Sequence, residues 1–130
     1  MKNFFQRRKI LKSVPFEELT PIKIFSSEEE VDGMKYILIP RFKNEILKKV
    51  FSSFRSEMIK VKLDLHGSQI WNLIDGKNKI KYIIEEFAKQ NSSMKDSKER
   101  ITLFISQLYV NGFITFKELL WDYKNKNSIN

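Results

Sequence analysis

The sequence predicts a small α+β domain in which short strands come first and helices follow. Between residues 20 and 63, apolar and polar residues alternate in short runs, as they do in half-buried strands. From residue 64 onward, apolar residues recur every three or four positions, which is typical of amphipathic helices. With 130 residues, 42% of them hydrophobic, the chain can build one core. We expect a small three-stranded antiparallel sheet followed by a three-helix bundle.

The chain divides into an arm, a domain and a tail. The arm contains aromatic side chains and basic residues, among them Arg7, Arg8, Lys9 and Lys12, before Pro15. It is either a basic arm for nucleic acid or membrane, or a partly ordered end whose Phe4, Phe5 and Ile10 pack on the domain. The tail is rich in Asn and Lys and is expected to fray. The arm spans residues 1–19, the domain spans 20–116, and the tail spans 117–130.

Three segments have the alternation of strands: 20–25, 35–40 and 58–63. The first two read as a hairpin, and the acidic residues between them, Glu28 to Asp32, read as its polar turn. In the third strand, Ile59, Val61 and Leu63 point to one face while Lys60 and Lys62 point to the other. Between the second and third strands, residues 44–54 predict an extra short helix that covers the sheet or contacts a partner.

Three helices follow, near 65–75, 80–90 and 97–111. Asp64 is a good N-cap for the first of them, and Gly112 ends the third. The second has no strong N-cap. Asp96 and Glu99 have the spacing of a capping box at the start of the third.

The net charge of +8 is concentrated in the first half of the chain. Residues 1–24 carry six basic and two acidic groups, and residues 41–63 carry seven and two. Residues 64–116 carry seven and six, so the helices are nearly neutral. A basic balance of this size is compatible with binding to an acidic partner.

The segment 63–76, LDLHGSQIWNLIDG, resembles the "LDxxGxxIWxLIDG" signature of the PqqD-like family. With the surrounding elements, the resemblance extends over about residues 20–116. The signature residues, which we expect to be structural, are Asp64, Gly67, Trp71, Leu73, Asp75 and Gly76.

The resemblance implies a winged-helix-like domain that acts as a peptide chaperone, also described as a RiPP recognition element. Such a domain holds the leader of a ribosomally made precursor peptide while a partner enzyme, such as a radical-SAM maturase, modifies it. In that family the leader lies between the third strand and the third helix.

The residues allow such a site in this chain. If strand 58–63 is a sheet edge, its unpaired backbone groups would accept an extended peptide. On the third helix, Ile101, Phe104, Ile105 and Leu108 form the core stripe, and a second stripe lies beside it. That second stripe is either one wall of a groove or a surface that the terminal segments cover. The peptide-binding residues are therefore predicted to be Ile59, Lys60, Val61, Lys62, Leu63, Leu103, Gln107 and Val110.

No group of residues indicates catalysis, a metal or a cofactor. The chain has no cysteine, which excludes thiolate sites, and its one histidine cannot form a metal site made of several histidines. His66 most simply contributes to the start of its helix. No apolar run approaches the ~20 residues of a membrane span, and no secretory signal precedes the domain, so we expect a cytoplasmic protein.

Two further alternatives stay open at this point. A winged-helix DNA-binding protein would suit the overall charge, although the third helix has Leu103, Ser106, Gln107 and Val110 where a recognition helix carries basic and amide side chains. Pairing of exposed strands from two chains would give a homodimer.

Overall fold

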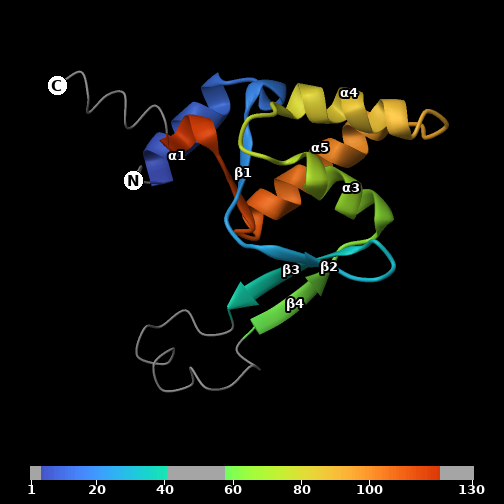
Figure 1. Cartoon of the computed structure of the whole chain (residues 1–130). Coiled ribbons are helices and arrows are strands. Elements are labelled where there is room, and N and C mark those ends of the chain that lie inside the picture. The colour runs from blue at the N-terminus through green and yellow to red at the C-terminus, as the bar shows by residue number, and fades with distance from the viewer. Residues whose placement is uncertain (1–3, 41–57, 121–130) are drawn as a thin grey trace, which may run out of the picture. The chain divides into compact units, whose positions relative to one another are not determined.

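The computed structural model describes residues 4–40 and 58–120 (Figure 1). The chain forms two units, Met1–Ile24 with Asn72–Asn130, called unit 1 here, and Phe25–Trp71, called unit 2. The predicted helix 44–54 and the residues after 120 lie outside the described part of the chain.

Unit 2 contains a three-stranded antiparallel sheet in the order β2-β3-β4. Its strands are β2 (Ser27–Glu29), β3 (Lys35–Pro40) and β4 (Met58–Lys62). The central strand β3 pairs Ile37 with Val61 of β4 and with Ser27 of β2. The prediction of a small three-stranded antiparallel sheet that includes 35–40 and 58–63 is therefore confirmed.

The first strand of that sheet was predicted at 20–25, and this is wrong. The hairpin partner of β3 is β2, and it includes Glu28 and Glu29, which the sequence placed in the turn. The turn itself is shorter: Gly33 has a φ of 81°, and Glu30 N–H donates to the Met34 carbonyl. Two acidic residues fit in a strand here because lysines of β3 and β4 lie near their carboxylates.

Helix α3 (Leu65–Leu73) begins as predicted. The Asp64 carboxylate accepts a hydrogen bond from Gly67 N–H at 2.6 Å, and the Asp64 carbonyl accepts one from Ser68 N–H. The Ser68 hydroxyl in turn accepts from Lys35 N–H at 2.8 Å, which joins α3 to the sheet of unit 2. Trp71 is fully buried, and its indole N–H donates to the Ser27 hydroxyl at 3.0 Å.

In unit 1, segments from the two ends of the chain lie side by side (Figure 1). Strand β1 (Pro21–Lys23) pairs antiparallel with β5 (Ile114–Phe116) and forms a separate two-stranded sheet. Pro21 stands first in its strand, where its missing N–H costs nothing. The helices are α1 (Phe4–Ser13), the short 3₁₀ helix η1 (Phe16–Glu18), α4 (Ile80–Gln90) and α5 (Ser97–Val110).

The core of unit 1 is mainly aliphatic. Helix α5 buries Ile101, Ile105 and Leu108, as its core stripe predicts, while Phe104 is only half-buried. Tyr109 stacks on Phe116 with ring centroids 4.9 Å apart. The buried apolar residues of this unit are Leu19, Ile74, Ile80, Ile83, Phe87, Ile101, Ile105, Leu108, Ile114, Phe116 and Leu119.

The ends of α5 differ in how well the sequence predicted them. Asp96 has a left-handed backbone, with φ 61°, and its side chain caps nothing, so the predicted capping box is wrong. At the other end Gly112 has φ 80°, and Phe113 N–H donates to the Leu108 carbonyl. That is the bond pattern of a Schellman motif, for which glycine is the preferred residue.

The described residues thus form an α+β protein with a small three-stranded sheet, a separate pair of strands, and several helices. Within them, no helix has the length and apolar character needed to cross a membrane.

Candidate functional site

The outer edge of β4 is the feature of unit 2 that can bind another chain. One edge of β4 pairs with β3, and no strand within the described residues pairs with the other. Leu63 N–H donates to the Lys35 carbonyl at 2.9 Å, which marks residues 35 and 63 as a hydrogen-bonded pair. Because such pairs alternate along an antiparallel ladder, Ile59 and Val61 also direct their backbone groups to β3. The backbone N–H and C=O of Lys60 and Lys62 therefore point to the outer edge.

The two faces of this sheet differ in character. Ile37, Ile39, Ile59 and Val61 share one face by their register, and Ile37 is fully buried there while Ile59 is 42% exposed. Lys60 and Lys62 lie on the other face, as the alternation predicted. A strand added at the outer edge would continue both faces, so it would need alternating apolar and polar residues.

The lysines of β4 already have acidic partners in the same unit. Lys60 Nζ lies 3.5 Å from Glu28 and 3.9 Å from Glu30, and Lys62 Nζ lies 3.7 Å from Asp32. All five side chains are about half exposed, so each pair contributes little to stability. The carboxylates nevertheless offset the positive charge of Lys60 and Lys62 on this face of the sheet.

Lys62 also lies over the ring of Tyr36, with its Nζ 5.7 Å from the ring centroid. Tyr36 first, and Asp32 after it, raise the pKa of Lys62, so this lysine stays charged throughout the physiological range. On this face of the sheet, both lysines of β4 therefore lie beside acidic side chains, and Lys62 also lies beside an aromatic ring.

The second stripe of α5 is exposed in unit 1. Leu103 is 61% exposed and Val110 is 80% exposed, and Gln107 between them is also exposed. In the described part of the chain, the terminal segments do not cover this stripe. Leu63, by contrast, is only 7% exposed, so of the eight predicted peptide-binding residues its side chain is the least available to a guest.

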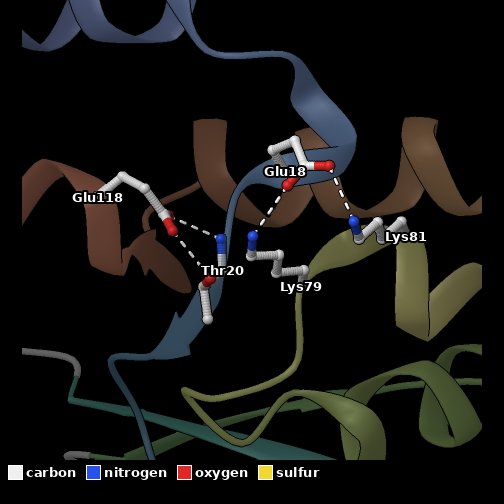
Figure 2. Close-up of polar contacts among 5 residues, drawn as sticks. All are labelled: Glu18, Thr20, Lys79, Lys81 and Glu118. Carbon is white, nitrogen blue, oxygen red and sulfur yellow. Dashed lines mark hydrogen bonds and ion pairs between the residues drawn. The ribbon is translucent and has the colours of Figure 1, made fainter.

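A polar cluster that the sequence did not indicate ties β1 to two helical segments of unit 1. Figure 2 shows the Glu118 carboxylate facing Thr20, whose N–H and hydroxyl donate to it at 2.7 and 2.8 Å. It also shows Glu18 between Lys79 and Lys81, which lie 2.9 and 3.0 Å from its two oxygens. These hydrogen bonds, from Lys79 first and then Lys81, lower the pKa of Glu18. Every carboxylate in this cluster has a partner, so the cluster is structural.

The signature residues have local structural roles. Asp75 accepts backbone hydrogen bonds from Lys77 and Asn78 at 2.9 and 2.8 Å; the one from Asn78 contributes most to lowering the pKa of Asp75. Gly76 has φ 79°, which favours glycine, as expected for the turn that follows α3. Asp64 caps α3 by accepting a hydrogen bond from Gly67 N–H in its first turn. Trp71 is buried in the core, and Leu73 is the last residue of α3.

His66 is half-buried in the first turn of α3. Within the described residues, no group of three or more His, Cys, Asp or Glu side chains could hold a metal ion. Comparisons with family models, curated proteins and solved structures give no match for this chain.

Proposed function

We propose that this protein is a non-catalytic peptide-binding module, which binds an extended segment of a ribosomally made precursor peptide along the outer edge of β4. The observation that carries the proposal is the orientation of the backbone at Lys60 and Lys62. Their N–H and C=O groups face outward from a strand that has one partner in the described chain. Unpaired edges of this kind recognise extended peptides by strand addition.

Main-chain hydrogen bonds would supply much of the affinity, and the two faces of the sheet would supply the choice of guest. Guest side chains beside Ile59 and Val61 would be apolar, since that face is apolar in β3 and β4. Guest side chains beside Lys60 and Lys62 would meet paired lysines. An acidic guest would therefore have to replace Glu28, Glu30 and Asp32 as the counterions of these lysines.

In unit 1, Leu103 and Val110 of α5 are exposed, so a partner could reach them without unfolding. The sequence resemblance to the PqqD-like family, with its winged-helix-like domain, favours a leader peptide as the guest and a radical-SAM or similar maturase as the partner that performs the chemistry. Both precursor and partner would be cytoplasmic.

A proline at position 60 tests strand addition directly. Because the Lys60 N–H points away from β3, Lys60→Pro removes a hydrogen bond to the guest but none to β3. A peptide selected from a displayed random library is titrated against each variant, and folding is checked by circular dichroism. We expect Lys60→Pro to weaken binding about tenfold or more, one 1.4 kcal/mol step per decade.

Two matched variants make the test specific. Lys60→Gln removes the side-chain charge but keeps the N–H, so it should change affinity much less than Lys60→Pro. Leu103→Asp, at an exposed position of unit 1, leaves the core unchanged and tests the α5 stripe by itself. Equal affinity for Lys60→Pro and the parent protein would place the site elsewhere. Sequence-specific binding of duplex DNA that persists at physiological salt would favour the winged-helix DNA-binding alternative.

A further inference from the structure

A cavity of about 480 Å³ lies in unit 1, where α1 meets the end of α5 and the paired strands. Its walls include Leu11 from α1, Val110 from α5, Ile24 directly after β1, and Ile114 from β5. The volume is within the range of ~300–1,000 Å³ that small-molecule sites occupy. This cavity belongs to unit 1 alone, so it is separate from the outer edge of β4.

The apolar residues that line the cavity differ in exposure. Ile24 is 51% exposed and Val110 is 80% exposed, whereas Ile114 is buried at 1%. Exposed aliphatic side chains that line a hollow, rather than a convex surface, can be covered by a small apolar group. Burial of such a group would be favourable because it removes apolar surface from water.

Two arginines add positive charge to this apolar hollow. Arg7 and Arg8 line it from α1, a helix with four basic residues and no acidic one. Three other cations of unit 1 have carboxylate partners: Lys79 and Lys81 pair with Glu18, and Lys98 pairs with Glu17 at 2.7 Å. Within residues 4–40 and 58–120, the ion pairs between side chains do not involve Arg7 or Arg8.

We propose that this cavity binds an amphiphilic carboxylate, a small molecule with an aliphatic tail and one anionic head. The tail would lie against Ile24 and Val110, and the head would meet the guanidinium groups of Arg7 and Arg8. Guanidinium matches a carboxylate because its planar fork donates two parallel hydrogen bonds. A polyanion such as nucleic acid fits less well, since it would leave the apolar walls uncovered.

Octanoate and 1-octanol are a matched pair of probes for this site, since they share the tail and differ in charge. Each is titrated into the full chain while the methyl NMR signals of Ile24, Val110 and Ile114 are followed. We expect octanoate to shift these signals at concentrations where 1-octanol has little effect. Arg7→Gln with Arg8→Gln should weaken octanoate about tenfold, the effect of losing a charge-assisted hydrogen bond.

The control is Lys9→Gln with Lys12→Gln, which removes the same charge from the same helix at exposed positions outside the cavity. It should leave octanoate binding close to that of the parent. Val110→Asp should also exclude octanoate, because it supplies the arginines with a carboxylate from the chain itself. Equal binding of octanoate and 1-octanol, or equal loss in the two double variants, would overturn the proposal and leave a purely apolar docking face. Absence of any shift at these methyl groups would overturn it as well.

Discussion

The two units use their charged residues in different ways. In unit 2, Lys60 and Lys62 meet their carboxylates at 3.5–3.9 Å on an open sheet face. In unit 1, the Thr20–Glu118 and Glu18–lysine contacts measure 2.7–3.0 Å and join segments up to 98 residues apart. The ion pairs of unit 2 are long and solvated, so a guest could replace them. The contacts of unit 1 instead join segments that are far apart in the sequence.

This difference assigns separate roles to the two units. Unit 2 offers a strand edge whose polar neighbours can rearrange at little cost, as a peptide-binding edge requires. In unit 1, Thr20, directly before β1, is joined to Glu118 by hydrogen bonds that are partly buried. Substitutions at charged residues should therefore change stability in unit 1 more than in unit 2.

The largest effect expected in either unit is that of Trp71→Ala. Trp71 is fully buried and anchors α3 to β2 through its hydrogen bond with Ser27. Removing the ring should lower the free energy of unfolding by about 3–5 kcal/mol. Urea unfolding followed by fluorescence and by circular dichroism measures this loss. Leu103→Ala, at a site 61% exposed, is the control and should change the free energy by at most about 0.5 kcal/mol.

A smaller loss is expected for Glu118→Ala in unit 1. Thr20 is 4% exposed, and without Glu118 its N–H and hydroxyl would both lose their acceptor. We expect the free energy of unfolding to fall by about 1–3 kcal/mol, the cost of leaving a buried donor unsatisfied. Glu28→Ala, the matched change in unit 2, should cost at most about 0.5 kcal/mol, because its ion pair is half exposed. If Glu28→Ala proves more costly than Glu118→Ala, the contrast between the units is wrong.

The sequence predicts the parts of this fold that depend on neighbouring residues. The bounds of β4 and α4, the cap at Asp64 and the stop at Gly112 follow from alternation, helical periodicity and local hydrogen bonding. The sequence does not predict the features that depend on pairing between distant segments. The strand at 20–25 pairs with β5, some 90 positions away, and nothing near residue 20 specifies that partner.

At the candidate site, too, the sequence predicts the local features but not those that depend on other segments. Alternation in 58–63 correctly separates the lysine face from the apolar face. However, which backbone groups of β4 point outward depends on its register with β3, and so does the placement of Glu28 and Glu30 near Lys60. The cavity at Arg7 and Arg8 brings α1 next to residues more than 100 positions later, so no local pattern indicates it.

The smallest effect that we predict is the contribution of Glu18 to acid stability. Lys79 and Lys81 hold the pKa of Glu18 below its ordinary value of 4.5. A carboxylate with a lowered pKa in the folded state binds its proton less readily there than in the unfolded chain. The stability it contributes is therefore present above the unfolded pKa and is lost as the pH falls through the folded pKa. Because Glu18 and both lysines are solvated, the contribution is small and should shrink further with added salt.

Glu18→Gln isolates this contribution. Between about pH 5 and about pH 3, the melting temperature of the parent should fall more steeply than that of the variant, because only the parent loses the Glu18 charge. Lys79→Gln with Lys81→Gln should flatten the curve in a similar way, since it removes both groups that lower the pKa of Glu18. Thermal melts at matched ionic strength across this range measure the three slopes. Parallel slopes for parent and variants would show that Glu18 does not link η1 to α4 in solution. The charged contacts of unit 1 would then be as exchangeable as those of unit 2.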